Sequence, residues 1–496
     1  MRAASAALLF SALVLAVAVW MRGARGLRLQ LAAGAAAVCA IVASVAAGDW
    51  PWQLWLVLVG CAVSCVAIMT VRRQPTWRTA VALTGCTVLS VGLVLGAGAA
   101  LIALPEVRLM SPSGSAAVGT TVVELIDQSR AEPATLDTND RRFVVVQAWY
   151  PAEADVGDHA WYLGRDQAEA ETVAAGLAQV LGVPPFLLSK ATEARTSARY
   201  DAPPLATDQQ FPVVLFSPGL TGVRGQNTGW AQDLASHGYV VIAVDHPHDA
   251  AAVIRRDGTV VRTTVASTGD DAADNATVDR LTALRAADLR FVLDEVNRIT
   301  GTGLAEARSE AGDAGLSRLR GRLDLQRTAV AGHSLGGAAA LFAAGHDPRM
   351  RAVVDLDGLP RCETTLKHRP PVLALVAGRG SGSASGDERY DQVLGDVLSA
   401  AASPSFRVEV PGAAHLSFTD APSLLPPLPS LVGNAGRTSG VRAASVATRA
   451  FLDEVLAAPG PDPTSVTLGE HLGRIGEVTL PEVRDSASRP QRPTCG

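Results

Sequence analysis

Four long apolar runs fill the first 104 residues, and they constrain the fold of this chain more than any other feature. They occupy residues 3–20, 31–47, 52–71 and 79–104 and carry almost no charge. Each is close to the ~20 residues that a helix needs to cross a bilayer. None shows the polar stripe of a helix that packs on a soluble core, which is the alternative interpretation. The sequence therefore predicts a region of four transmembrane helices over residues 1–104.

The charges between the runs predict an orientation. Arginines lie between runs one and two and between runs three and four, at Arg22, Arg25, Arg28, Arg72, Arg73 and Arg78. The connection between runs two and three, "GDWPW", has Asp49 and no basic residue. Because cytoplasmic loops are enriched in Lys and Arg, both termini and everything after the fourth run are expected outside the cytoplasm. A cleaved signal peptide is the alternative for the first run, but three more runs follow it.

The rest of the chain reads as an α/β domain. Residues 105–118 are predicted to be a linker, 119–458 the folded domain and 459–496 a polar, partly disordered tail. Strands are expected at 121–126, 142–150, 211–217, 239–245, 328–332, 352–356, 371–377 and 405–410. Helices are expected at 229–237, 278–299 and 441–456, and a hairpin turn at 255–259. Strands that alternate with helices predict a mostly parallel sheet covered on both faces.

Two cysteines lie beyond the apolar runs, Cys362 and Cys495. A disulfide between them is permitted if this part of the chain lies outside the cytoplasm. Nothing in their spacing requires one.

A candidate nucleophile lies in the stretch "AVAGHSLGGAAALF", residues 329–342. Ser334 is the centre of a G-x-S-x-G pentapeptide that follows a predicted strand and opens an alanine-rich helix. Strand, sharp turn and helix in this order form the nucleophile elbow of α/β-hydrolases, in which glycines are needed because the turn is tight. The alternative is an ordinary serine that caps the helix.

A nucleophilic serine needs a base and an acid, which in this fold follow in the order Ser, acid, His. Three histidines follow Ser334 at a useful distance: His346, His368 and His415. His415 is the predicted base because it comes just after the last strand. Three carboxylates compete as the acid, and spacing alone does not separate them: Asp355, Asp357 and Asp387.

Two further segments belong near such a site. "SPGLTG", residues 217–222, follows a buried-type strand and can supply a backbone N–H to an oxyanion. The segment from Asp245 to Asp249, "DHPHD", is expected to line the pocket rather than to bind a metal. No cluster with metal-ligand spacing is present in the sequence, so neither a metal nor another cofactor is expected.

Several of these motifs resemble one family. The stretch 211–246, "RLDLQRTAVAGHSLGG", "AVVDLDG" and "GAAHLSFTD" closely resemble the secreted and intracellular type II platelet-activating factor acetylhydrolases, over roughly residues 119–458. The resemblance implies Asp357 as the acid, the amides of Leu220 and Leu335 as oxyanion donors, and short acyl esters of lipids as substrates. This chain departs from the mammalian members by Pro218, where they have histidine, and by its apolar N-terminal region.

The expected function is therefore a membrane-anchored serine esterase that faces the outside and acts on lipids or small esters. Neither a nucleic-acid partner nor a metal is expected. Two alternatives stay open. One is a non-catalytic receptor or scaffold that uses the hydrolase fold as a binding module. The other is an esterase or acyltransferase for a non-lipid ester.

Overall fold

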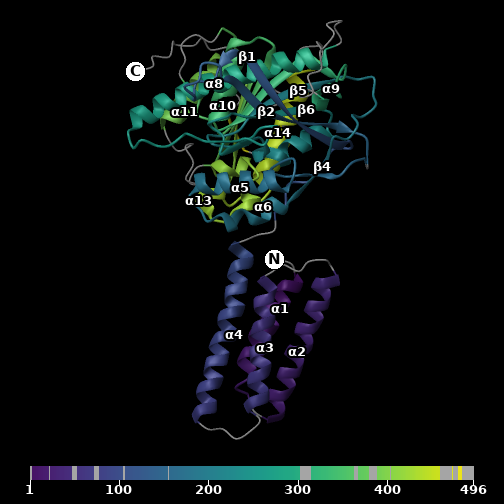
Figure 1. Cartoon of the computed structure of the whole chain (residues 1–496), viewed down its shortest axis with the longest axis vertical. Helices are drawn as coiled ribbons and strands as arrows, with labels where there is room; N and C mark the ends of the chain where they lie inside the picture. Colours follow the sequence, from purple (N-terminus) through teal and green to yellow (C-terminus); the bar gives the residue numbers. More distant parts are fainter. Residues whose placement is uncertain are drawn as a thin grey trace. The chain divides into compact units, whose positions relative to one another are not determined.

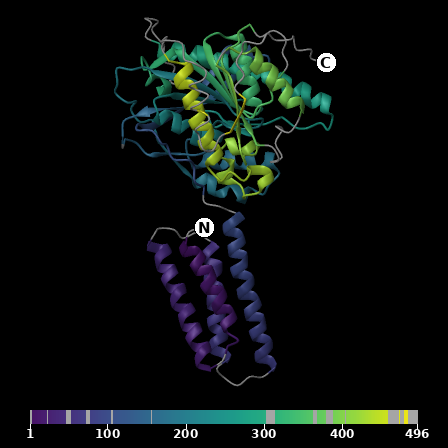
Figure 2. The ribbon, with the colours of Figure 1, turned by 180° about the vertical axis from the view of Figure 1, so that it is seen from behind.

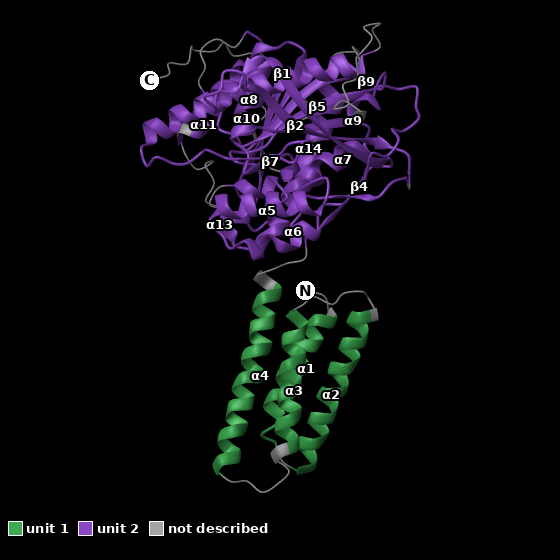
Figure 3. Cartoon of the chain, viewed as in Figure 1, with its two compact units in different colours: residues 1–105 green, residues 106–496 purple. Residues whose placement is uncertain are grey.

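The chain forms two compact units, residues 1–105 and 106–496 (Figure 3). The computed structural model describes residues 3–21, 23–46, 53–71, 77–103, 107–154, 156–301, 314–361, 367–378, 388–402, 404–457, 472 and 479–482. The predicted alternative acid Asp387, both Cys362 and Cys495, and most of the predicted tail lie outside these residues.

The first unit has a helix at each of the four apolar runs (Figure 1): α1 (Ala3–Ala18), α2 (Gly23–Ala46), α3 (Gln53–Val71) and α4 (Trp77–Ala103). Helix α1 contacts the other three. Small side chains such as Ala12, Ala37 and Ala97 fill the contact. A buried hydrogen bond from Ser64 Oγ to Ser90 Oγ, 3.1 Å long, joins α3 to α4.

Among the described residues, two of these helices are long and apolar enough to cross a membrane, through Gly23–Val45 and Trp77–Leu101. The apolar segments of α1 and α3 are shorter, Ala4–Ala18 and Gln53–Met69. At 1.5 Å per residue they reach only about 23 and 26 Å, against a hydrocarbon core of ~30 Å. Length and composition thus support two spans where the sequence predicted four. Arg25 and Arg28, expected between two spans, lie within α2.

The second unit is built on one sheet, with the order β13-β12-β11-β10-β9-β5-β6-β2-β1-β4-β3 in the part of the chain that the structure describes. Six neighbouring strands, from β6 to β12, run parallel. The bounds are β1 (Ala117–Ala131), β2 (Arg141–Ala152), β3 (His159–Trp161), β4 (Arg195–Tyr200), β5 (Phe211–Ser217), β6 (Val240–Asp245), β9 (Leu323–His333), β10 (Met350–Leu356), β11 (Val372–Ala377), β12 (Phe406–Val410) and β13 (Thr479–Glu482). A separate hairpin pairs β7 (Ala252–Ile254) with β8 (Val260–Arg262), around the predicted turn.

Helices cover both faces of the sheet, as predicted. Val213 and Leu215 of β5 join the core beneath α8 (Asp271–Thr300) and α10 (Leu335–His346). Val214 and Phe216 point the other way, into the core beneath α7 (Thr228–Ser236) and α14 (Ser439–Val455). The rear view in Figure 2 shows α14, in yellow, lying across the sheet. Successive side chains of a strand alternate between faces, so the apolar run at 211–216 of β5 contributes to both cores.

The remaining helices were not expected from the sequence. They are α5 (Gln167–Leu181), η1 (Pro185–Leu188), α6 (Ser189–Glu193), η2 (Arg224–Asn227), α9 (Ala314–Ser317), α11 (Glu388–Ala400), η4 (His415–Phe418), α12 (Ala421–Leu424) and α13 (Pro429–Val432). The predicted strands are all present, and β1 and β9 are longer than expected.

The segment after residue 106, expected as a linker, lies along α7. The Met110 carbonyl accepts a hydrogen bond from Gln232 Nε2 at 2.6 Å. The Ser113 amide donates to Asp233 Oδ1 at 2.7 Å. This segment is therefore fastened to the second unit before β1 begins.

Candidate active site

The carboxyl ends of the parallel strands bring the predicted site residues to one edge of the sheet. Ser334 follows β9, Asp357 follows β10, and His415 begins η4 after β12. The glycine-containing loop at residues 217–222, here called the oxyanion loop, begins at the last residue of β5. This edge is where open α/β sheets bind their ligands.

Ser334 occupies a strained turn between β9 and α10. Its φ is 55° and its ψ is −122°, a conformation that L-residues rarely adopt. Both flanking glycines are required by close packing. A Cβ at Gly332 would lie 2.1 Å from the backbone of Gly336, and one at Gly336 would lie 1.9 Å from the carbonyl oxygen of Ser217. Both glycines of the motif therefore allow the tight turn around Ser334, as expected from the sequence.

Asp357 and His415 are hydrogen-bonded. The Asp357 Oδ2 to His415 Nδ1 distance is 2.7 Å, and Oδ1 of the same carboxyl accepts from the Ala377 amide at 2.9 Å. The Asp357 side chain is fully buried, whereas that of His415 is about one-third exposed. Since a carboxylate only accepts, the neutral tautomer of His415 that fits this bond has its proton on Nδ1 and keeps Nε2 as an acceptor.

A second chain of hydrogen bonds ties the elbow to the oxyanion loop and to His415. The Gly219 amide donates to Gln226 Oε1 at 3.2 Å, and Gln226 Nε2 lies 2.9 Å from His333 Nδ1. His333 Nε2 in turn lies 2.9 Å from the His415 carbonyl oxygen. Burial, and then the neighbouring His415, lower the pKa of His333 well below its usual range. A neutral His333 that is protonated on Nε2 satisfies every bond in the chain.

Ser334 Oγ itself has no hydrogen-bond partner among the described residues. The backbone of Ser334 is fixed instead, since its amide donates to the Leu356 carbonyl at 3.0 Å, one residue before Asp357. In an unliganded site, the lack of a hydrogen bond from Ser334 Oγ to His415 does not argue against their acting together. Catalytic hydrogen bonds often tighten only around the substrate.

The competing residues lie elsewhere. His346 closes the far end of α10, with its Nδ1 2.9 Å from the Phe342 carbonyl. The His368 amide donates to Gly345 at the same end. A helix of 12 residues spans about 18 Å, so both histidines are remote from Ser334 at its start.

Asp355 lies beneath α10 rather than beside His415. Its Oδ1 accepts from the Gly358 amide at 2.9 Å, and its Oδ2 is buried with no partner. Burial, and then the nearby Asp357, raise the pKa of Asp355 well above its usual range. Burial therefore favours the neutral form of this carboxyl.

Among the backbone amides of the oxyanion loop turn, residues 219–222, that of Leu220 has no acceptor in the described part of the chain. Gly219, Thr221 and Gly222 donate to Gln226 Oε1, Asp249 Oδ1 and the Gly219 carbonyl respectively. Pro218 has no N–H. No described residue accepts from the Leu220 amide, nor from that of Leu335, the first residue of α10. A Cβ at Gly219 would lie 3.5 Å from Ser334 Cβ, so this loop adjoins the elbow.

The "DHPHD" segment, expected to line the pocket, is mostly buried in ion pairs. Asp245 pairs with Arg224, and Asp249 pairs with Arg285 at 2.6 Å. His246 lies between Ser217 Oγ, at 3.0 Å from Nε2, and an aspartate of α8. Among the described residues no group of three His, Cys, Asp or Glu side chains is arranged to hold a metal ion.

Ser217, His246 and Asp288 repeat the Ser-His-Asp pattern, with 2.8 Å between His246 Nδ1 and Asp288 Oδ2. All three side chains are buried, at 2 % exposure or less. Burial lowers the pKa of His246. Burial alone would raise the pKa of Asp288, but Arg142 and His246 hold it well below its usual range. Because all three side chains are buried and hydrogen-bonded in series, we interpret this group as structural.

Sequence comparison identifies the family. Residues 102–457 match the family described as "Platelet-activating factor acetylhydrolase, isoform II", which is well over half of the chain. The chain belongs to this family. The resemblance seen in the motifs is thereby confirmed.

Individual relatives are more distant. Platelet-activating factor acetylhydrolase from Cavia porcellus is 27 % identical over 230 residues, which are 44 % of this chain and 50 % of the relative. A probable 1-alkyl-2-acetylglycerophosphocholine esterase from Arthroderma benhamiae is 28 % identical over 30 % of this chain and 31 % of its own. The chain thus spans about half or less of the length of these curated relatives.

The fold has a relative of known structure. A ferulic acid esterase from Streptomyces cinnamoneus aligns with a TM-score of 0.57 and 27 % identity, over 76 % of this chain and all of that one. The predicted α/β-hydrolase fold of the second unit is therefore confirmed. The names of all these relatives are those of ester hydrolases, which supports the prediction of a carboxylic-ester hydrolase.

Proposed function

We propose that this chain is a membrane-anchored serine esterase that hydrolyses carboxylic esters of lipids or small molecules through Ser334, His415 and Asp357. The observation that carries the proposal is the 2.7 Å hydrogen bond between Asp357 and His415 at the sheet edge that also presents the Ser334 elbow. Family membership and the names of the relatives agree with it.

Hydrolysis then takes two steps. His415 Nε2 accepts the Ser334 proton while Oγ attacks the ester carbonyl, and the amides of Leu220 and Leu335 bind the resulting oxyanion. His415 returns the proton to the departing alkoxide, which leaves an acyl-enzyme on Ser334. His415 next takes a proton from water, whose hydroxide attacks the acyl group, and the acid is released with Ser334 restored.

Asp357 has two tasks in this cycle. It keeps the His415 proton on Nδ1, and its buried charge stabilises the imidazolium that forms in each step. Two backbone donors aimed at the oxyanion contribute several kcal/mol to the transition state. No further cofactor enters either step.

The names of the relatives support the proposed substrate class. Platelet-activating factor acetylhydrolases and 1-alkyl-2-acetylglycerophosphocholine esterases are named for short acetyl esters of ether lipids. Cutinase est1 of Thermobifida alba and the ferulic acid esterase are named for other esters. We infer a short acyl ester of a lipid as the substrate. A series of nitrophenyl esters, followed by acetylated phospholipids, measures this preference.

We also propose that the four-helix unit anchors the enzyme in a membrane through α2 and α4, with the hydrolase unit outside the cytoplasm. The support is the apolar surface of α1 to α4 and the distribution of arginine between the runs. Cysteine accessibility in intact cells tests it. If a reagent added outside the cells labels a cysteine placed at position 72, the proposed orientation is wrong.

Covalent labelling tests the chemistry. A fluorophosphonate probe should label the wild-type protein on the peptide that contains Ser334, and Ser334→Ala should lose both the label and the esterase activity. A receptor or scaffold would not react. Label found on the buried Ser217 instead, or activity retained by Ser334→Ala, would contradict the assignment.

A further inference from the structure

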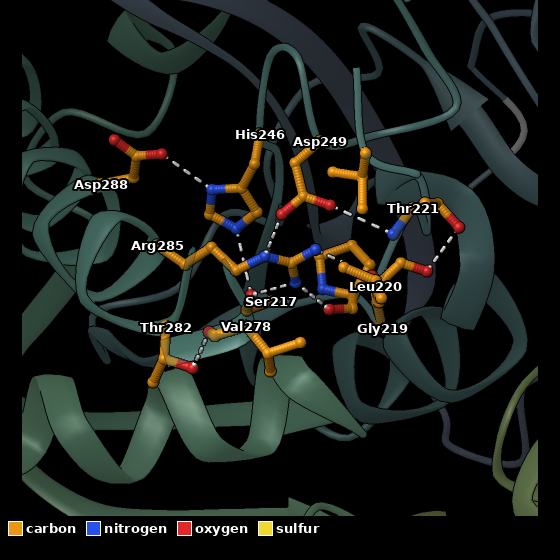
Figure 4. Close-up of polar contacts among 12 residues, drawn as sticks. Ser217, Gly219, Leu220, Thr221, His246, Asp249, Val278, Thr282, Arg285 and Asp288 are labelled. Carbon is orange, nitrogen blue, oxygen red and sulfur yellow. Dashed lines mark hydrogen bonds and ion pairs between the residues drawn. The ribbon is translucent and has the colours of Figure 1, made fainter. Parts of the chain in front are cut away.

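A buried arginine of α8 donates hydrogen bonds to the oxyanion loop (Figure 4). Arg285 is fully buried. Its Nη1 donates to the Pro218 carbonyl at 2.5 Å and its Nη2 to the Gly219 carbonyl at 3.0 Å. Nη1 also lies 3.4 Å from Ser217 Oγ. One guanidinium thus holds three successive residues of the loop.

Asp249 links Arg285 to the residue that follows Leu220 in the loop. Its Oδ2 accepts from Arg285 Nε at 2.6 Å, while its Oδ1 accepts from the Thr221 amide at 3.1 Å. Burial would raise the pKa of this carboxyl, but Arg285 holds it below its usual range. The carboxylate therefore stays charged and bridges the guanidinium to the loop.

The loop needs such support because its backbone is strained. Thr221 has a φ of 58°, which costs a non-glycine residue on the order of 1 kcal/mol or more. Its amide is held by Asp249, its carbonyl accepts from the Ala251 amide at 2.9 Å, and its hydroxyl donates to the Leu220 carbonyl at 2.6 Å. These bonds fix the peptide unit that follows Leu220.

The peptide unit that precedes Leu220 is the important one. The Gly219 carbonyl and the Leu220 N–H belong to the same planar trans peptide, in which the C=O and the N–H point in opposite directions. A bond from Arg285 to the Gly219 oxygen therefore also sets the direction of the Leu220 N–H. The Gly222 amide also donates to this oxygen, at 2.9 Å, but that bond lies within the loop, whereas Arg285 ties the peptide to α8 with a charged donor.

We propose that Arg285, together with Asp249, is a positioning residue that fixes the Gly219–Leu220 peptide so that the Leu220 N–H faces the oxyanion. This inference rests on the proposed esterase function. Arg285 touches no reacting atom and acts through the backbone of the loop. Its contribution belongs to the transition state, because the donor is strengthened only when the carbonyl oxygen becomes an anion.

The test compares two buried arginines in the full-length protein. Arg285→Lys keeps the charge but loses the planar fork that reaches both carbonyls. Arg142→Lys is the control. Arg142 is also buried and bound to two carboxylates, at 2.6 and 2.9 Å, but its backbone contact is Pro247, outside the oxyanion loop.

Arg285→Lys should lower kcat roughly a hundredfold and leave KM within about threefold. Its Ki for a trifluoromethyl ketone, which forms an anionic adduct with the nucleophile, should rise by the same factor. Arg142→Lys should lower the melting temperature and leave kcat and Ki within a few fold. A loss of folded protein alone reduces the active fraction and does not change Ki.

Asp249→Asn provides a second variant should Arg285→Lys not fold, because asparagine keeps the size of the side chain and an acceptor for the Thr221 amide. It should also lower kcat more than it raises KM. Wild-type kcat and Ki in a folded Arg285→Lys protein would overturn the positioning role while Ser334→Ala remains inactive. Activity in Ser334→Ala would instead overturn the esterase proposal itself.

Discussion

The bond between Asp357 and His415 leads to the sharpest prediction, for the variant Asp357→Asn. The wild-type carboxyl uses Oδ1 for the Ala377 amide and Oδ2 for His415 Nδ1. Asparagine must turn its single oxygen toward Ala377 to keep that buried N–H paired. Its NH2 group then faces His415, which can accept only by moving its proton to Nε2. That tautomer cannot take a proton from Ser334.

The size of the effect follows from this geometry. Two opposite unit charges about 4 Å apart attract by about 4 kcal/mol at an effective dielectric of 20. In the Asp357→Asn variant, the His415 imidazolium of the transition state loses this attraction to residue 357. That alone corresponds to roughly a thousandfold in rate. The wrong tautomer adds to it, so the expected loss in kcat is about 10⁴-fold.

The assay is nitrophenyl acetate hydrolysis by the full-length protein in detergent, with Asp355→Asn as the matched control. Asp355 lies two residues earlier, and burial raises its pKa, which favours a neutral form that asparagine matches in shape and charge. We expect this control to stay within about threefold of wild type. The reasoning is refuted if Asp357→Asn keeps a tenth of the activity, or if Asp355→Asn loses more than Asp357→Asn does.

Three further variants probe the packing and the buried charges. Gly336→Ala places a Cβ against the Ser217 carbonyl, so activity should fall by at least about a hundredfold; a wild-type rate would show that the elbow tolerates a side chain. Trp230→Ala empties a fully buried site beside Phe216 and should cost about 3–5 kcal/mol of unfolding free energy in denaturant titrations. Burial raises the pKa of Asp420 to about 7, so the wild type should lose stability as the pH rises from about 4 through 7, because the folded state resists losing this proton. Asp420→Asn should remove up to about 4 kcal/mol of that decline in stability. If the melting temperatures of the two proteins change with pH in the same way, this prediction is wrong.

The sequence was informative where the structure is set locally. Strands β5, β6 and β11 are nearly continuous apolar runs, and the glycines around Ser334 indicate a turn in which a side chain would clash. The spans were less predictable, because the apolar runs do not say where a helix ends. Helix α1 ends at Ala18, before the end of its run.

The choice between Asp355 and Asp357 could not be made from spacing. In a regular strand, residues two apart share a face. Asp357 lies one residue beyond β10 with a φ of 55°, so the backbone turns and the two carboxyls diverge. That turn is set by the neighbouring strands, whose contacts are not local in sequence.

Arg285 was missed although the sequence carried a signal for it. It lies four residues after Leu281 and four before Leu289, within the apolar stripe of α8. A charged residue at such a position is rarely buried without partners. The partners themselves, Asp249 and the loop carbonyls, could not be named before the helix was placed against β5.

The small strand β13 has a consequence for how the protein can be handled. It pairs antiparallel with β12 and forms the outer edge of the sheet, although the sequence analysis placed it in a polar tail. A truncation after residue 457 would uncover β12, with its row of free amides and carbonyls beside Phe406 and Val408. Uncovered strands of this kind join to those of other molecules. Shortened versions of this enzyme should therefore be prone to self-association, and a tag is better attached beyond Glu482 than in place of the segment that contains it.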